Sequence, residues 1–332
     1  MNSMKSSNNQ IRIGIIGYGN VGKGVELAVN QNPDLVLAGI FTRRSPTSSA
    51  RAPKTKLFHI SELDEYCNSI DVAILCGGSA TDLPEHGPKF SSMFNTVDSY
   101  DTHANMLDYF NKVDEAARSA NKTSVIAIGW DPGLFSLMRF LFESTLPIGK
   151  SYTFWGPGVS QGHSNAVRGI TGVKNAVQYT IPIEISLKQV RNGENPTLTS
   201  REMHKRVCYV VPEDDADLVK IKREIETMPN YFEPYDTEVY FIPETEFLKK
   251  YSEMPHGGFV LRSGTTGEKH KELMEFSVKL DSNPEFTGSI MAAYARAAYR
   301  LNREGNYGAK TVLDIAPAYL SIKPKNILLK GL

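Results

Sequence analysis

Three glycines near the start of the chain have the spacing of a nucleotide-binding turn. Gly17, Gly19 and Gly22 form the pattern G-x-G-x-x-G, after the apolar run from Ile11 to Gly17 and at the start of a helical stretch from Asn20 to Asn30. The first glycine of such a turn permits a tight bend, the second lets the backbone approach a pyrophosphate, and the third lets helix pack closely on strand. A ligand-free glycine turn is the alternative, but the position after a first strand favours a dinucleotide site.

The end of the second apolar run indicates which dinucleotide. The run from Leu35 to Thr42 is followed by Arg43 and Arg44, at the place where an NAD enzyme has an Asp or Glu for the ribose 2′-hydroxyl. Two guanidinium groups and a hydroxyl instead suit a 2′-phosphate. A solvated basic turn is the alternative. We predict NADP as the cofactor.

Five further stretches concentrate polar groups among glycines, prolines and aromatics, and contain both tryptophans of the chain. They are Cys76–Asp82 (CGGSATD), Asp98–Asp101 (DSYD), Gly129–Gly133 (GWDPG), Trp155–His163 (WGPGVSQGH) and Pro255–Gly258 (PHGG). The first three follow successive strand-like runs, and open α/β sheets bind ligands at the carboxyl ends of their strands. These stretches are therefore candidates for contact with cofactor and substrate.

The elements that must position these residues alternate between strand and helix in the first part of the chain. Strand-like runs lie at 11–17, 35–42, 71–76, 96–98 and 124–128, with a clear helical pattern at 106–120. This alternation predicts an α/β fold with a Rossmann-type, doubly wound parallel sheet over residues 1–129.

Beyond residue 129 the pattern changes. Longer strand-like runs at 152–155, 206–211, 237–242 and 276–280 mix with helical stretches such as 216–227. We predict a second α+β domain with a mixed sheet over residues 130–285. An amphipathic helix follows at 286–303, and we expect the region 286–332 to pack back on the first domain.

Composition bounds the class of partner. Lysine plus arginine (37) balances aspartate plus glutamate (37) in a chain of 332 residues, so we expect no nucleic-acid or membrane partner but a small-molecule substrate. Three cysteines (Cys67, Cys76, Cys208) and seven histidines show no metal-ligand spacing, so we predict reduced thiols, no metal and a cytoplasmic protein. The opening MNSMKSSNNQ lacks the apolar core of a signal peptide and predicts a disordered tail.

Taken together, the chain resembles the meso-diaminopimelate dehydrogenase family from about Ile11 to Ser321. The resemblance rests on VDSYD-like, GWDPG, TFWGPG, SQGHS, AVQYT, HKR, MPHGG and KLD-x-NP segments in the same order. It implies NADP-dependent oxidation of the D-centre of meso-2,6-diaminopimelate to an imine, which water converts to L-2-amino-6-oxopimelate and ammonia. It also implies lysine biosynthesis and a homodimer formed through the second domain.

By resemblance, Asp101 and Asp131 would face the reacting amine. A turn-forming Asp-Pro-Gly is the alternative for Asp131, and a helix cap for Asp101. The other substrate residues implied are Trp130, Trp155, Gln161, Gly162, Thr180, Arg206, His256 and Asn283. A surface charge is the alternative for Arg206 and a loop histidine for His256. The chain departs from the family at Asn165, where the family has Asp after SQGHS, which puts strict meso specificity in question.

The predicted cofactor residues come from the glycine turn, the end of the second strand and the strand-end loops. They are Gly17, Tyr18, Gly19, Asn20, Val21, Gly22, Thr42, Arg43, Arg44, Cys76, Gly77, Gly78, Ser79, Ala80, Thr81, Ser99, Tyr100, Asp101, Gly129, Trp130, Asp131 and Pro132. Two alternative functions remain: another two-domain NADP oxidoreductase, such as a dihydrodipicolinate-reductase-like or homoserine-dehydrogenase-like enzyme, or a non-catalytic NADPH sensor.

Overall fold

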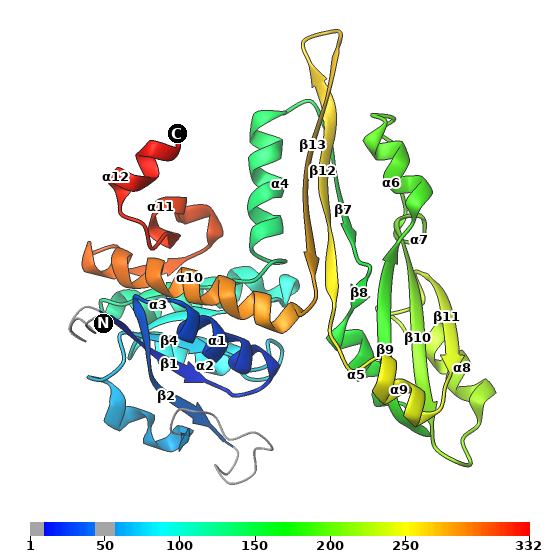
Figure 1. The fold of residues 1–332 in the computed structure, drawn as a ribbon, viewed down its shortest axis with the longest axis horizontal. Coiled ribbons are helices and arrows are strands. Elements are labelled where there is room, and N and C mark those ends of the chain that lie inside the picture. The colour runs from blue at the N-terminus through cyan, green and yellow to red at the C-terminus, as the bar shows by residue number, and fades with distance from the viewer. Residues whose placement is uncertain (1–9, 44–56) are drawn as a thin grey trace, which may run out of the picture. The chain divides into compact units, whose positions relative to one another are not determined.

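The structure is a computed structural model that describes residues 10–43 and 57–332 (Figure 1). Arg44 and residues 1–9 of the expected N-terminal tail lie outside the described residues. The chain divides into two compact units: unit 1 contains residues up to Leu137 together with Pro284–Leu332, and unit 2 contains Met138–Asn283. The sequence placed the boundary after residue 129, whereas the compact units part after residue 137.

Unit 1 is built on a seven-stranded parallel sheet in the order β14-β6-β5-β4-β1-β2-β3. Its strands are β1 Ile11–Ile16, β2 Leu35–Thr42, β3 Leu57–His59, β4 Val72–Leu75, β5 Asn95–Asp98, β6 Thr123–Val125 and β14 Gly308–Lys310. The order runs outward from β1 in both directions, so the sheet is doubly wound and has its switch point between β1 and β4. The predicted Rossmann-type sheet is confirmed.

Strands of this sheet are connected by α1 Asn20–Gln31, α2 Leu83–Ser91 and α3 Met106–Ser119, whereas α10 Asn283–Arg303 follows β13 and leads into β14. Short helical segments complete the unit: η3 Ile60–Tyr66, η4 His103–Asn105, η5 Val312–Asp314, α11 Pro317–Leu320, α12 Lys325–Leu328 and η6 Leu329–Gly331. Parallel strands need such crossover connections because a tight hairpin can join only antiparallel neighbours.

Helix α10 lies against α1, and two glycines make the close approach possible. A Cβ added at Gly24 of α1 would lie 2.4 Å from the carbonyl oxygen of Pro284, and one added at Gly288 would lie 2.4 Å from the carbonyl carbon of Gly24. The backbones of the two helices are therefore in contact here, in the part of unit 1 where Figure 1 draws α10 beside α1.

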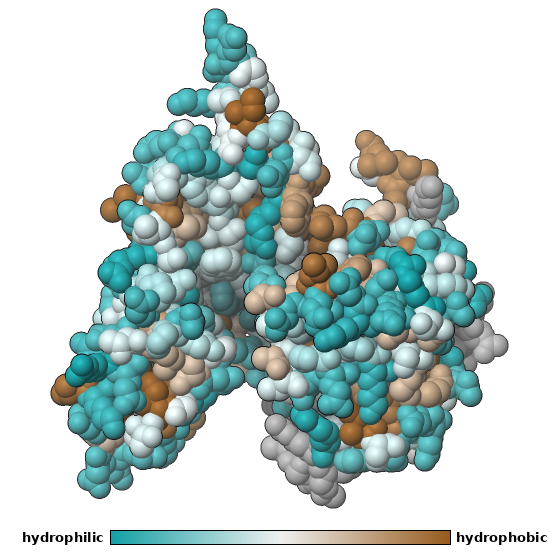
Figure 2. All heavy atoms as spheres, turned by 180° about the vertical axis from the view of Figure 1, so that it is seen from behind, coloured by the Kyte–Doolittle hydropathy of each residue, from teal (hydrophilic) through white to brown (hydrophobic). Residues whose placement is uncertain are grey.

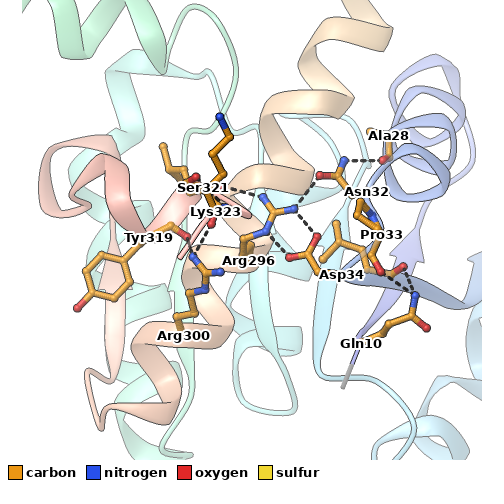
Figure 3. A network of polar contacts seen from close by, with 12 residues as sticks. Gln10, Ala28, Asn32, Pro33, Asp34, Arg296, Arg300, Tyr319, Ser321 and Lys323 are labelled. Carbon is orange, nitrogen blue, oxygen red and sulfur yellow. Dashed lines mark hydrogen bonds and ion pairs between the residues drawn. The ribbon is translucent and has the colours of Figure 1, made fainter. Parts of the chain in front are cut away.

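A buried arginine ties α10 to the entry of β2 and to the C-terminal segment (Figure 3). Arg296 is 2% exposed and donates to both carboxylate oxygens of Asp34, at 2.5 and 2.7 Å, and to the side chain of Asn32 at 2.7 Å. Its remaining terminal nitrogen donates to the carbonyl oxygen of Leu320 at 2.7 Å. Arg300 adds bonds to the carbonyl oxygens of Tyr319 and Ser321, so residues 319–321 are held on unit 1.

Unit 2 contains two sheets. The four-stranded mixed sheet has the order β11-β10-β9-β8, and the three-stranded antiparallel sheet has the order β13-β12-β7. The strands are β7 Gly149–Trp155, β8 Gly158–Val159, β9 Val173–Pro182, β10 His204–Pro212, β11 Asp236–Phe241, β12 His256–Thr266 and β13 His270–Leu280. The helices are α4 Leu134–Thr145, which begins in unit 1, α5 Gln161–Arg168, α6 Glu184–Arg191, α7 Ser200–Met203, α8 Leu218–Glu226 and α9 Glu244–Lys250.

Apolar side chains are concentrated in the interior of each unit. In unit 1 one cluster joins sheet residues such as Ala73 and Leu75 to Tyr109 and Val113 of α3. On the face shown in Figure 2, hydrophilic residues predominate and apolar ones form separate small groups, the distribution expected when the large apolar side chains are buried. Among the described residues, every helix is too short or too polar to cross a lipid bilayer.

Candidate active site

The glycine turn between β1 and α1 has the geometry that its motif predicts. Gly17 has a φ of +96°, and an added Cβ there would lie 3.0 Å from the carbonyl carbon of Cys76. An added Cβ at Gly22 would lie 2.3 Å from the carbonyl oxygen of Gly17, whereas one at Gly19 would meet open space. Gly19 is the N-cap of α1 and has no side chain to occupy the first N–H groups, so this helix end is open to an anion.

A pocket lies at the switch point of the sheet, between the ends of β1, β2 and β4. Eight of the predicted cofactor residues line it: Gly17, Tyr18, Gly19, Thr42, Arg43, Cys76, Gly77 and Gly78. Ile16, Phe41, Ile60, Asp82 and His86 line it as well, although the sequence did not single them out for this role. Residues from four separate segments thus converge where α/β sheets bind dinucleotides.

Arg43 already has an anionic partner in this pocket. Its guanidinium lies 2.9 Å from one carboxylate oxygen of Asp82, and two thirds of the Arg43 side chain is exposed. The other oxygen of Asp82 accepts the backbone N–H of Gly78 at 2.9 Å. Burial lowers the pKa of His86, on the next turn of α2, so this neighbouring imidazole is neutral at pH 7. Arg43 and the N-terminus of α1 are the groups here that can attract phosphate.

The loop after β5 carries the first predicted catalytic carboxylate. Asp101 is exposed, and its backbone N–H donates to the hydroxyl of Ser79 at 2.8 Å. This bond links the DSYD and CGGSATD loops. The Tyr100 side chain is 2% exposed and stacks on Tyr109 at 3.9 Å between ring centroids, so Tyr100 can offer a cofactor its backbone but not its ring.

The GWDPG loop after β6 carries the second carboxylate and folds back tightly on itself. Gly133 has a φ of +130°, and an added Cβ there would lie 1.8 Å from the carbonyl oxygen of Gly129. The N–H of Phe135 donates to the carbonyl of Trp130 at 2.8 Å, and their rings meet edge to face. Trp130 is 7% exposed and Asp131 is half-buried, so the loop holds both side chains in a defined place beside α4.

In unit 2 the structure brings together predicted residues for a carboxylate site. Arg206 of β10 lies opposite Thr180 of β9 and donates to its hydroxyl. The guanidinium also lies over the Tyr235 ring, 4.0 Å from the centroid. Among the described residues, the buried Nε of Arg206 and Oε1 of Gln178 have no hydrogen-bond partner. Because a buried unpaired polar atom is costly, a polar ligand at this place would satisfy them.

The glycines of TFWGPG let His256 and Thr180 come close to this loop. An added Cβ at Gly156 would lie 2.1 Å from the carbonyl oxygen of Thr180, and one at Gly158 would lie 2.4 Å from the Cα of His256. His256 is 8% exposed and begins β12, so this residue, which the family resemblance assigned to the substrate site, lies in a strand rather than in a loop. Asn283 joins this group through a bond from its N–H to the carbonyl of Met254 at 3.0 Å.

Two histidines that were not among the predicted site residues, the buried His204 and the half-buried His163, lie in this part of unit 2. His204 Nε2 accepts the backbone N–H of Trp155 at 2.8 Å, and the two rings stack. His163 pairs with the Ser160 hydroxyl at 2.7 Å. Burial, with the charge of Arg206, lowers the pKa of each imidazole to about 4. In the sequence, these histidines appeared only as members of the HKR and SQGH segments. Both imidazoles are neutral at pH 7.

Three further residues considered in the sequence lie in α5. Gln161 and Gly162 form the first turn of α5. Asn165 is exposed, and its side-chain oxygen accepts from Arg168 of the same helix. The described residues contain no group of three His, Cys, Asp or Glu side chains placed to hold a metal ion.

Two protein-family models match this chain. A model of the oxidoreductase family with an NAD-binding Rossmann fold matches residues 11–107, and a model of the diaminopimelic acid dehydrogenase C-terminal domain matches residues 129–282. The meso-diaminopimelate D-dehydrogenase of Ureibacillus thermosphaericus is 58% identical over 323 residues, which cover 97% of this chain and 99% of that protein. The chain belongs to the meso-diaminopimelate dehydrogenase family.

Solved structures of this family superpose on the whole chain. A mutant meso-diaminopimelate dehydrogenase from Clostridium tetani with DAP is 53% identical, covers 97% of this chain and 100% of that chain, and has a TM-score of 0.93. An engineered D-amino acid dehydrogenase bound to NADP+ is 43% identical, covers 97% and 99%, and has a TM-score of 0.86. The family resemblance of the sequence is therefore confirmed.

Proposed function

We propose that this enzyme catalyses the NADP-dependent oxidative deamination of the D-centre of meso-2,6-diaminopimelate. The products are L-2-amino-6-oxopimelate, ammonia and NADPH, and the reaction is reversible. Support comes from the full-length meso-diaminopimelate D-dehydrogenase relatives and from the family structure with DAP. Because the relatives match both the cofactor part and the C-terminal domain, the comparisons do not favour a homoserine-dehydrogenase-like or dihydrodipicolinate-reductase-like enzyme, or a sensor.

The observation that carries this function is the buried Arg206–Thr180 pair in unit 2. A guanidinium with an unpaired, buried Nε is suited to a carboxylate, which it can bind with two parallel hydrogen bonds. A substrate with a second amino-acid centre supplies such a carboxylate at a distance from the carbon that is oxidised. We assign Thr180, Arg206, His256 and Asn283 to this distal, L-configured centre, with Trp155, Gln161 and Gly162 beside it.

NADP is the proposed cofactor, and the unit 1 pocket fits it. The open N-terminus of α1 would hold the pyrophosphate, and Arg43, with Arg44 and Thr42, the 2′-phosphate. The other cofactor residues named from the sequence remain part of this proposal. When bound, NADP supplies a hydride acceptor. An engineered relative bound to NADP+ supports this choice.

We propose that Asp101 and Asp131 hold the ammonium of the D-centre beside Trp130. One carboxylate takes a proton from the ammonium, so that the nitrogen lone pair can form the C=N bond as hydride leaves the carbon. Water then adds to the imine and releases ammonia. The carboxylates act by charge and position, so their removal should lower kcat/KM for the amine.

The test is NADPH formation, followed by absorbance, with meso-diaminopimelate, the L,L- and D,D-isomers, simple D-amino acids and homoserine. We expect turnover with the meso isomer and ammonia release in a 1:1 ratio to NADPH. Oxidation of homoserine with silence toward every amine would overturn the proposal. NADPH binding without any turnover would favour the sensor.

A homodimer formed through unit 2, a place in lysine biosynthesis and a cytoplasmic location complete the proposal. The family resemblance supports the first two, and the reduced thiols expected from the cysteine pattern support the third. Light scattering after size exclusion tests the first: a mass near twice 36.8 kDa is expected, and a mass of one chain would contradict it.

A further inference from the structure

A buried carboxylate beneath the two catalytic loops has no role in the reaction as proposed so far. Asp98 ends β5 and is fully buried. One of its side-chain oxygens accepts the N–H of Tyr100 at 3.0 Å and that of Ala127 at 3.1 Å. The other accepts the hydroxyl of Tyr109 of α3 at 2.6 Å. A single side chain therefore connects the exits of β5 and β6 to a helix behind the sheet.

The two amides that Asp98 holds belong to the segments that carry the predicted catalytic residues. Tyr100 precedes Asp101 directly, and Ala127 lies two residues before Gly129, the first residue of the GWDPG loop. Ala127 has a φ of +58°, a conformation that L-residues with a side chain rarely adopt and that surrounding structure must stabilise. The backbone oxygen of Asp98 also accepts the N–H of Ile128 at 2.8 Å.

The helix end of this arrangement is fixed as well. The Tyr109 ring stacks on that of Tyr100, and Gly87 of α2 leaves space for the Tyr109 hydroxyl, since an added Cβ there would lie 2.1 Å from it. Burial raises the pKa of Asp98 to about 6, although the bonds from Tyr109, Tyr100 and Ala127 oppose that rise. At pH 7 the group is mainly ionised, and a buried anion makes strong hydrogen bonds to neutral donors.

We propose that Asp98 is a positioning residue that, through the amides of Tyr100 and Ala127, sets the distance between the loops bearing Asp101 and Asp131. A hydrophobic side chain would fill the same space without the desolvation cost of a buried charge, but it would leave both loops without a common anchor. The inference rests on the proposed deamination, because the distance between the two loops affects the rate only if Asp101 and Asp131 act together on the amine. Displacement of reacting groups by about 1 Å can cost about 100-fold in rate.

The test compares Asp98→Leu, Asp98→Asn and Tyr109→Phe in the full chain. We expect Asp98→Leu to lower kcat for meso-diaminopimelate about 10- to 100-fold. Asp98→Asn keeps an oxygen that accepts from both amides and should retain most of kcat. Tyr109→Phe loses one donor and should fall between them. Val113→Ala, a cavity variant in the same cluster as Tyr109, controls for lost stability and should leave kcat unchanged.

Hydrogen–deuterium exchange separates the anchor from the reaction. In Asp98→Leu, peptides covering residues 98–102 and 126–133 should both exchange faster, while the Val113→Ala control keeps both protected. An unchanged kcat in a folded Asp98→Leu, or faster exchange in one loop only, would overturn the inference. If the wild type does not oxidise meso-diaminopimelate, the catalytic role falls with the proposed function, whatever the exchange shows. If Asp98→Leu does not fold, equal kcat in wild type and Tyr109→Phe would overturn it.

Discussion

Arg43 must exchange one anionic partner for another if it is to bind a 2′-phosphate. In the pocket its guanidinium pairs with Asp82, and Asp82 also holds the N–H of Gly78. A dianionic phosphate competes well with a single carboxylate, because two thirds of the Arg43 side chain is exposed and can turn to a ligand. A ribose hydroxyl, which is neutral, competes poorly. The ion pair therefore favours NADP over NAD by leaving Arg43 with its internal partner when no phosphate is present.

Replacing Arg43 and Arg44 together by Ala should weaken NADP+ binding far more than NAD+ binding. Loss of charge-assisted hydrogen bonds to phosphate predicts an increase in the Kd for NADP+ of about 10- to 100-fold, measured by fluorescence titration. Lys112→Ala, an exposed position on α3, is the control and should change neither constant. Equal weakening of both dinucleotides would reject the 2′-phosphate role.

Replacing Arg206 by Met should impair recognition of the second carboxylate. Met fills a similar volume but leaves the ligand charge unpaired, so kcat/KM for meso-diaminopimelate should fall about 100-fold or more. The Kd for NADPH should stay unchanged. Arg201→Met, an exposed arginine just before β10, serves as the matched control. A parallel loss of NADPH affinity would show that Arg206 does not belong to the substrate site.

His204 makes the stability of unit 2 depend on pH in the acid range. Its folded-state pKa of about 4 lies below the ordinary value because of burial, so between pH 6.5 and 4 the unfolded chain takes up a proton that the folded chain does not. The free energy of unfolding should fall as pH falls, by up to about 3 kcal/mol. Urea unfolding at pH 7.5 and 5 measures this. His204→Gln should flatten the dependence and His270→Gln, at an exposed position, should not; equal slopes in all three would contradict it.

At the scale of elements, the runs read from the sequence located strands in both units. Strands β1, β2 and β4, which are rich in Ile, Leu and Val, and the helices α1 and α3 lie within a few residues of their predicted bounds, and so do β5, β10 and β11. Strand β12 was not identified, because Gly257, Gly258 and Gly264 interrupt its apolar pattern. Its pairing with β13 is a local hairpin, but its pairing with β7 depends on contacts distant in sequence.

The residues of the candidate site also divide into those predictable from the local sequence and those fixed by tertiary contacts. The glycine turn and the Thr42–Arg43 end of β2 follow from local spacing and meet in one pocket. Asp82 and His204 could not be assigned in the same way, because their partners lie 39 and 49 residues away in the chain. The local sequence pattern shows which polar side chains are present, whereas tertiary packing determines which residue each of them pairs with.

The contact between α1 and α10 offers a test of packing at a glycine. Gly24→Ala adds a methyl group 2.4 Å from the carbonyl oxygen of Pro284. Although Ala favours a helix by about 1 kcal/mol over Gly, the overlap should separate the helices and lower the melting temperature of the protein. Asn30→Ala, on the exposed side of α1, is the control. A higher melting temperature for Gly24→Ala would show that the helices adjust without cost.

At the scale of the whole molecule, the first and last parts of the chain form one unit. Arg296 joins α10, the entry of β2 and the segment at Leu320 through one guanidinium. Although burial raises the pKa of Asp34, the hydrogen bond and charge of Arg296 lower it below its ordinary value. This pair therefore stabilises unit 1 at neutral pH, and its contribution is lost as pH falls through the folded-state pKa of Asp34.

Replacing Arg296 by Met should destabilise unit 1 by about 3 kcal/mol or more, because it leaves a partly buried carboxylate and a carbonyl without their donor. Chemical unfolding at pH 7, with fluorescence and circular dichroism as probes, measures the change. Arg303→Met, at the end of the same helix, should have little effect. A difference of less than about 0.5 kcal/mol between Arg296→Met and wild type would show that the network is not a principal support.

The order of elements along the chain also determines when the parts of unit 1 are synthesised on the ribosome. Six strands of the parallel sheet leave the ribosome before residue 126, but the edge strand β14 and the long helix α10 are made only after all of unit 2. At translation rates of about 5–20 residues per second, the nascent sheet spends about 10–40 s without them. Unit 2 is continuous in sequence, so the second half of the enzyme can complete its fold first, and the cofactor half is finished by the last residues translated.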